Sequence, residues 1–67
     1  MQLSARNQLK GKVKSINTND VSAEVLIDVN GQELCSTITA GSVKSLDLKE
    51  GDNVTAIIKA SSVMLMK

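Results

Sequence analysis

Two short clusters of hydrogen-bond donors lie near the two ends of the sequence. Ser4-Ala5-Arg6-Asn7 precedes one run of alternating residues, and Lys59-Ala60-Ser61 follows another. Each cluster combines a cation, a hydroxyl group and a small alanine, and neither contains a carboxylate. A fully deprotonated tetrahedral dianion has only acceptor oxygens, so it requires a donor set of this kind. The clusters are candidates for an oxyanion site, and the alternative is an ordinary polar surface at two strand ends.

The sequence offers few residues for catalysis or for binding a metal cation. The chain has no histidine and a single cysteine, Cys35. This composition leaves no usual tetrahedral zinc set and no nucleophile with a partner base. No phosphate-cradling glycine motif occurs. We therefore expect a protein that is not an enzyme, has no catalytic residues and holds no metal cation.

The length and composition favour one small domain that associates with copies of itself. The 67 residues predict a single domain over 1–67, and a chain of this size has little excess stability. One cysteine excludes an internal disulfide, and the sequence is 42% hydrophobic but contains no aromatic residue. Small domains with so few means of stabilisation commonly oligomerise. Self-association is therefore expected.

The sequence also indicates where the protein is found and which partners it lacks. Its first ten residues contain no apolar segment typical of a secretory signal, and no apolar run approaches the ~20 residues of a membrane span. A single free thiol suits a reducing compartment. The formal charge of +1 creates no strong field toward nucleic acid or membrane. We expect a cytoplasmic protein that binds neither nucleic acid nor a membrane.

Alternating apolar residues predict a β-rich first half. Leu9–Lys14 and Val21–Val29 alternate with the period of half-buried strands, and Gly11 suggests a bend or a close backbone approach. Asn30-Gly31 between alternating runs predicts a hairpin turn in which both residues have positive φ. The returning strand is expected over Gln32–Thr39.

The second half predicts one short helix and two further strands. The helix is expected over 41–46, with Thr39 or Ser42 as its cap. A turn over 49–52 leads to a fourth strand from Val54 to Ile58, and Val63–Met66 is expected to form a fifth. Together these elements predict an all-β fold, an OB-like five-stranded β-barrel with one short helix between strands 3 and 4.

Four large apolar residues alternate against the expected core: Leu26, Ile57, Met64 and Met66. Isolated apolar residues on a surface are common, but four on the short strands of a small barrel favour a second buried surface. Such a surface is expected between subunits. A purely structural oligomerisation module is one function that this pattern allows.

An OB-type module that binds single-stranded nucleic acid is the main alternative function. Lys10, Lys12 and Lys14 form a basic stripe on the first strand. Binding of single strands usually needs aromatic side chains on which bases stack, and this sequence has none. Three lysines on an exposed strand are more typical of a solvated face.

The order and spacing of matching residues across nearly the entire chain resemble a known family. The matches are Ser4-Ala5-Arg6-Asn7, Leu9, Gly11, Val13, Val21, Ala23-Glu24-Val25, Ile38-Thr39, Ser42-Val43, Leu48-Lys49, Gly51, Ala56, Ile58-Lys59-Ala60-Ser61 and Val63. They are similar to the molbindin (Mop) family of small molybdate- and tungstate-binding proteins, whose domain is also called TOBE. The resemblance implies intracellular storage or buffering of molybdate or tungstate, bound as oxyanions.

The same resemblance implies an assembly and a set of site residues. The assembly is a homohexamer, a trimer of dimers, with oxyanions bound between subunits. Ser4, Ala5 through its backbone, Arg6 and Asn7 would come from one chain, and Lys59, Ala60 and Ser61 from a neighbour, with Thr39 also near the anion. Relatives often have a hydroxyl residue at the position of Ala60, so here its N–H group is the expected donor.

Overall fold

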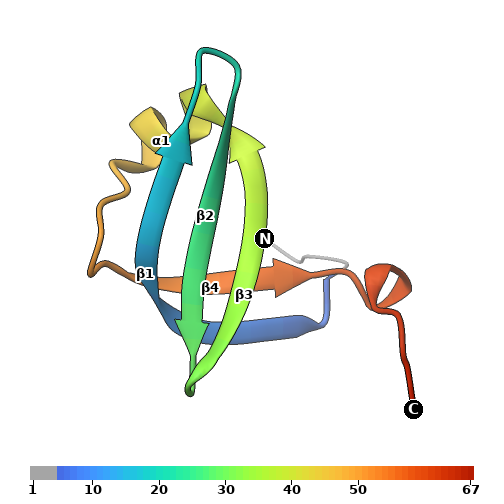
Figure 1. The fold of residues 1–67 in the computed structure, drawn as a ribbon. Coiled ribbons are helices and arrows are strands. Elements are labelled where there is room, and N and C mark those ends of the chain that lie inside the picture. The colour runs from blue at the N-terminus through green and yellow to red at the C-terminus, as the bar shows by residue number, and fades with distance from the viewer. Residues whose placement is uncertain (1–4) are drawn as a thin grey trace.

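A computed structural model describes residues 5–67, so Ser4 of the expected site lies outside the described residues. Its elements are β1 (Asn7–Thr18), β2 (Ser22–Val29), β3 (Gln32–Thr39), α1 (Ala40–Leu46), β4 (Asn53–Ile58) and a 3₁₀ turn, η1 (Ala60–Ser62). The strands form one antiparallel sheet in the order β3-β2-β1-β4, which is strongly curled (Figure 1). The fold is therefore mostly β with one short helix, as predicted.

The long strand β1 bends and changes its partner. Its first half, Asn7–Lys12, pairs with β4, and its second half pairs with β2. The register shifts between Val13 and Ser15, where the strand bends. A Cβ atom on Gly11 would lie 2.6 Å from the carbonyl oxygen of Asp28, so only glycine fits this approach. The close approach suggested by the sequence is confirmed.

The hairpin between β2 and β3 follows the sequence closely. Asn30 and Gly31 have φ values of 52° and 85°, the positive values that the turn requires. The Gly31 N–H group donates to Asp28 Oδ1 at 2.9 Å, which further fixes the turn. The strand β3 begins and ends at the predicted residues. This hairpin forms the upright part of the sheet in Figure 1.

The helix α1 begins at a side-chain cap. Thr39 is extended, with φ −74° and ψ 152°, and its Oγ1 accepts a hydrogen bond from the Ser42 N–H group at 3.0 Å. This bond satisfies one of the N–H groups that lack a partner at a helix start. The helix ends at Asp47, which is left-handed with φ 50°. Of the two predicted caps, Thr39 is the one used.

We expect Thr39→Ala to lower the free energy of unfolding by about 1 kcal/mol, because the cap to Ser42 is lost. Urea denaturation followed by circular dichroism measures this loss. Ser45→Ala is the matched control, since Ser45 is an exposed residue within the same helix. Equal midpoints for the two variants would show that the cap contributes nothing.

The hydrophobic core is small and one side of it is open. Its centre consists of Val13, Val25 and Ile27, which are at most 5% exposed. Half-buried apolar residues surround this centre on the concave side of the sheet: Ile16, Val29, Leu34, Ile38, Val54 and Ala56. Several of them line a groove of about 710 Å³ together with Leu46, Leu48 and Ile58. The four-stranded sheet therefore does not close into a barrel on this side.

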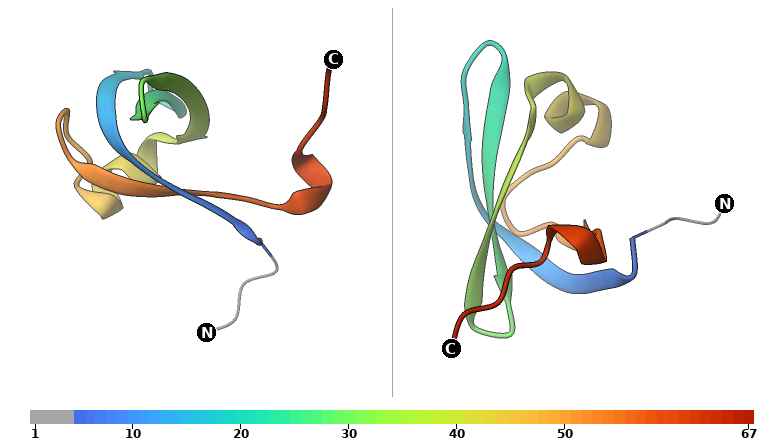
Figure 2. Two further views of the ribbon diagram at one scale, coloured as in Figure 1. Left: turned by 90° about the horizontal axis from the view of Figure 1, so that it is seen from below. Right: turned by 90° about the vertical axis from the view of Figure 1, so that its right-hand side faces the viewer.

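The expected fifth strand does not form in the described part of this chain. Val63–Met66 follows η1 without strand pairing, and Met64 and Met66 are 92% and 99% exposed. After β4 the chain turns at η1 and runs away from the sheet edges (Figure 2), so no strand of its own sheet lies beside it. The described residues form four strands in an open sheet. Neither α1 nor η1 has the length and hydropathy that crossing a membrane requires.

Candidate oxyanion site

The strand β1 begins beside the end of β4, and this pairing brings two cations, Arg6 and Lys59, to one end of the sheet. Asn7 pairs with Ile58, so Arg6 immediately precedes and Lys59 immediately follows the last paired residues. Both side chains are exposed. Gln8 and Ile57 are the next cross-strand partners. Arg6 and Lys59 therefore flank the same end of the β1–β4 ribbon.

This end of the ribbon contains no carboxylate. Residues 1–19 and 53–67 include no Asp or Glu. Within residues 5–67 the ion pairs are Lys14 with Glu33 and Lys49 with Asp47, and neither pair involves Arg6 or Lys59. Two like charges on neighbouring strands repel each other unless an anion lies between or beside them. The arrangement favours an anionic ligand.

The turn η1 adds neutral donors next to Lys59. Ser62 N–H donates to the Lys59 carbonyl at 2.9 Å and Val63 N–H donates to that of Ala60. The first N–H groups of the turn belong to Ala60 and Ser61, and such groups have no partner within their own helix. No backbone acceptor is found for them among the described residues outside the strand ladders. With the exposed Ser61 hydroxyl, they supply the donors that an oxyanion needs.

Asn7 has a different position from Arg6. It is the first residue of β1, is half-buried, and its Nδ2 donates to the carbonyl oxygen of Ile58 at 3.3 Å. The amide thus holds the start of β1 against the end of β4. Ala5 is half-buried and directly precedes Arg6. The structure therefore brings Ala5, Arg6 and Lys59 to one end of the ribbon, with Asn7 as the link behind them.

Thr39 is not near this end within one chain. It pairs with Ser22 at the start of β2, and the next residue of β2 pairs with Thr18, the last residue of β1. Arg6, by contrast, precedes the first residue of β1. The Thr39 hydroxyl donates to Ser42 Oγ at 2.8 Å and accepts from the Ser42 N–H group. Thr39 serves as a helix cap at the far end of the sheet.

The sequence interpretation missed that Arg6 and Lys59 are neighbours in the same chain. The available signal was their spacing, since Arg6 and Gln8, like Ile57 and Lys59, are two residues apart, which is the period of a strand. This spacing indicates that Arg6 and Lys59 are neighbours only when the register of β1 with β4 is known. That register is a long-range pairing and cannot be obtained from local alternation.

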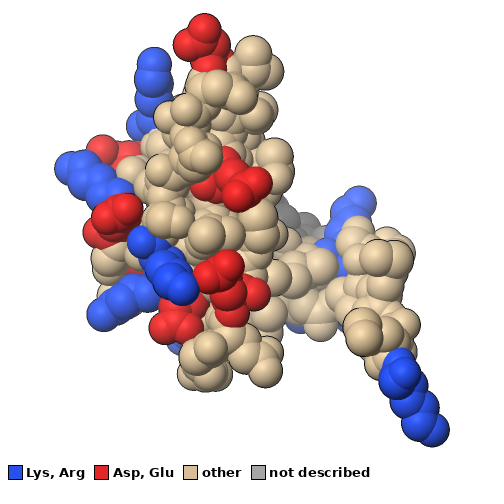
Figure 3. All heavy atoms as spheres, viewed as in Figure 1, with Lys and Arg blue, Asp and Glu red and all other residues tan. Residues whose placement is uncertain are grey.

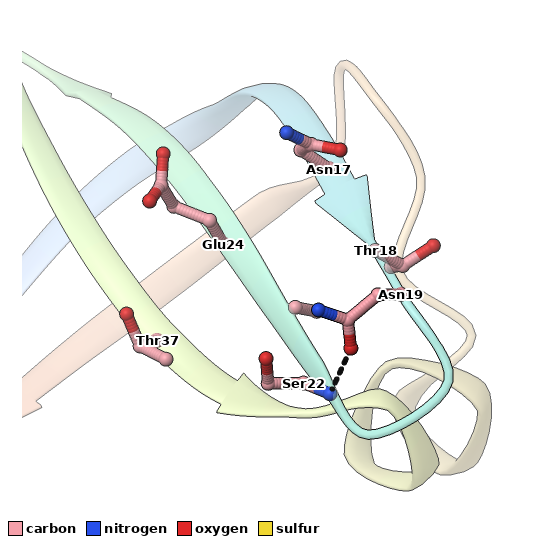
Figure 4. A pocket seen from close by; sticks show the side chains of 7 residues that line it. Asn17, Thr18, Asn19, Ser22, Glu24 and Thr37 are labelled. Carbon is pink, nitrogen blue, oxygen red and sulfur yellow. Dashed lines mark hydrogen bonds between the residues drawn. The ribbon is translucent and has the colours of Figure 1, made fainter.

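A second polar hollow lies at the turn between β1 and β2 (Figure 4), with a volume of about 200 Å³. Its lining residues are Asn17, Thr18, Asn19, Ser22, Ala23, Glu24 and Thr37. Asn19 Oδ1 accepts from the N–H groups of Val21 and Ser22, which closes the turn. The carboxylate of Glu24 disfavours an anion here. We attribute this hollow to the shape of the turn between β1 and β2.

An open, curled antiparallel sheet with donors and cations at one ribbon end defines a small all-β binding domain. The TOBE domain family matches residues 3–65, and the chain belongs to this family. It is 53% identical over 66 residues to a probable molybdenum-pterin-binding protein of Haemophilus influenzae, covering 97% of this chain and 96% of that protein.

Two solved structures have the same fold. A molybdate-binding protein from Sporomusa ovata superposes with a TM-score of 0.96 at 43% identity, covering 100% of both chains. The cytoplasmic molybdate-binding protein ModG, in a form with molybdate bound, matches with a TM-score of 0.88 at 46% identity. That match covers 96% of this chain and 46% of ModG. The family resemblance found in the sequence is confirmed.

Proposed function

We propose that this chain binds molybdate or tungstate as an intact oxyanion and serves as a cytoplasmic store or buffer for it, without catalysing a reaction. The observation that carries the proposal is the position of Arg6 and Lys59 at one ribbon end without carboxylates. The molybdate-binding proteins with the same fold support the choice of ligand. Residues 1–67 act as one binding domain.

The proposed site follows from the donors available at the ribbon end. The residues proposed for it are Ser4, Ala5, Arg6, Asn7, Thr39, Lys59, Ala60 and Ser61. Arg6 and Lys59 neutralise the dianion, and backbone N–H groups with the Ser61 hydroxyl orient it. Asn7 contributes through its hydrogen bond to Ile58, which holds the two halves of the ribbon end together.

Selection among oxyanions follows from size and protonation. Sulfate is also a tetrahedral dianion with the same demand for donors, so its rejection requires a cavity fitted to the larger molybdate or tungstate. Phosphate carries a proton near neutral pH, and a site without carboxylates offers that proton only the weaker acceptor oxygens of hydroxyl and amide groups. The absence of carboxylates at residues 1–19 and 53–67 supports this selection.

The site is completed by association of copies into a homohexamer, a trimer of dimers, with oxyanions between subunits. Where the ribbon ends of two copies come together, Arg6 of one copy and Lys59 of its neighbour would bind the same anion. Thr39 lies at the opposite end of the sheet from Arg6, so it can reach the anion only from a neighbouring chain. The open groove of about 710 Å³ and the exposed tail Val63–Met66 give each copy an apolar hollow and an apolar segment. A tail seated in a neighbour's groove would supply the fifth strand of the barrel.

Removal of residues 63–67 tests this part of the proposal. We expect the shortened chain to lose its oligomeric state, because burial of the four apolar tail residues is worth roughly 1.5–3 kcal/mol for each side chain. Native mass spectrometry at micromolar concentration measures the change. Removal of Lys67 alone is the control and should leave the assembly intact. An unchanged oligomer without residues 63–67 would exclude the tail from the interface.

Calorimetric titration with molybdate, tungstate and sulfate tests the function itself. The expected result is saturable binding of molybdate and tungstate and much weaker binding of sulfate. Equal binding, or no binding, of all three anions would refute the proposal. Native mass spectra with and without molybdate add a second measurement. An oligomer whose mass never changes with molybdate would indicate a purely structural module.

A further inference from the structure

The basic stripe on β1 runs toward the ribbon end at which Arg6 and Lys59 lie. Cross-strand pairs in the β1–β4 ribbon are Gln8 with Ile57, Lys10 with Thr55 and Lys12 with Asn53. We define the cationic face as the surface of these six residues together with the two that flank its open end: Gln8, Lys10, Lys12, Asn53, Thr55 and Ile57, with Arg6 and Lys59. All eight residues are exposed. The cationic face carries four positive charges and no negative charge.

Positive charge on this face has a carboxylate beside it only at Lys12, where Asp28 lies opposite on β2. All seven carboxylates fall between positions 20 and 52, which form β2, β3, α1 and the adjoining turns. In Figure 3 acidic and basic atoms lie side by side over the body of the sheet, whereas the projecting part shows only basic and uncharged atoms.

The three stripe lysines differ in their surroundings. Lys14 pairs with Glu33 at 2.9 Å, and this hydrogen bond and charge raise the pKa of Lys14. Lys10 faces Thr55 across the ribbon and has no carboxylate opposite it. Lys12 lies opposite Asn53 on one side and Asp28 on the other, without an ion pair. Lys10 is therefore the least compensated of the three.

We propose that Lys10 and Lys12 attract the oxyanion to the ribbon end through the field of the cationic face, without contacting the bound anion. The inference rests on the proposed function and extends it to two residues outside the ligand set. Charged surfaces with one sign raise the local concentration of an oppositely charged ligand. A dianion experiences twice the attraction of a monoanion, so the same lysines favour doubly charged oxyanions.

The expected strength of this attraction follows from the distances of Lys10 and Lys12 from Arg6. Lys10 and Lys12 are four and six residues from Arg6, which is at most about 13 Å and 20 Å along an extended strand. With Coulomb attraction in water and a Debye length of about 30 Å at 10 mM salt, loss of both charges weakens dianion binding about threefold. At about 150 mM salt the same loss is only about 1.3-fold, because screening removes most of the attraction.

The experiment measures molybdate dissociation constants by calorimetry at 10 and 150 mM salt for the full chain and two double variants. Lys10→Gln/Lys12→Gln is expected to bind about threefold more weakly at about 10 mM salt and nearly normally at 150 mM. Lys14→Gln/Lys49→Gln removes the same charge from the two ion-paired lysines and is the matched control. It is expected to weaken binding by less than about 1.5-fold.

Perrhenate, a monoanion of the same shape, provides a second measurement. Its binding should weaken only about 1.7-fold in Lys10→Gln/Lys12→Gln at low salt, the square root of the dianion effect. Equal affinities of the two double variants at 10 mM salt would overturn the inference. A loss that persists at 150 mM would also overturn it, because it would mean direct contact. Absence of molybdate binding by the unmodified chain would instead refute the proposed function, and the inference with it.

Discussion

Mixing Arg6→Ala chains with Lys59→Ala chains should restore molybdate binding that each variant lacks alone. Each variant by itself should bind molybdate about 10- to 100-fold more weakly, since a hydrogen bond to a charged group contributes roughly 1.5–3 kcal/mol. If one chain supplies Arg6 and a neighbour supplies Lys59, some sites in a mixed assembly contain neither substitution. With random mixing of equal amounts, about a quarter of the sites are intact.

Calorimetry of the refolded mixture measures the restored fraction of tight sites. The control is each variant refolded alone under the same conditions, which should show no tight sites. The outcome also decides between two arrangements, because Arg6 and Lys59 of one chain flank the same ribbon end. If the mixture binds as weakly as the separate variants, the two cations act from the same chain and the division between subunits is wrong.

A side chain at position 11 should remove a large part of the protein's free energy of unfolding. The Cβ of Gly11→Val would lie 2.6 Å from the Asp28 carbonyl oxygen and 2.7 Å from Ile27 Cγ2. The backbone carbonyl cannot move without disturbing β2, so we expect a cost of about 3 kcal/mol or more. A domain of this length has a free energy of unfolding of only roughly 3–10 kcal/mol.

Thermal denaturation followed by circular dichroism measures this effect. Gly41→Ala is the matched control, because its added Cβ meets no atom closer than 3.9 Å and lies within α1. Alanine is about 1 kcal/mol more favourable than glycine in a helix, so this variant should be unchanged or more stable. A midpoint for Gly11→Val equal to that of the unmodified chain would mean that β1 can shift away from Asp28.

Features with a local cause were predictable from the sequence. The Asn30-Gly31 hairpin, the Thr39 cap and the close approach at Gly11 each depend on one or two residue types with a specific backbone requirement. The buried face of β2 followed from alternation, and Ala23, Val25 and Ile27 are its buried residues. These features together fixed the strand order along the chain and the position of the helix.

Features that depend on distant pairing were not predictable in the same way. Val63–Met66 has the composition of a strand, but a strand also needs an adjacent edge, and this chain turns away at η1. The neighbouring positions of Arg6 and Lys59 depend on the register of β1 with β4. The separation of Thr39 from both cations depends on β1 changing partners midway. The hydrogen-bond donors of the candidate site could be predicted from the sequence, whereas their positions relative to one another could not.

If Thr39 of a second copy completes the site, as proposed, the separation of Thr39 from the Arg6 end affects how much oxyanion the cell can hold. A site completed by two copies exists only when copies meet, so the number of sites rises more steeply than the amount of protein at low expression. Halving gene dosage would then reduce stored oxyanion by more than half. Such a buffer would respond to its own expression level as well as to the supply of its ligand.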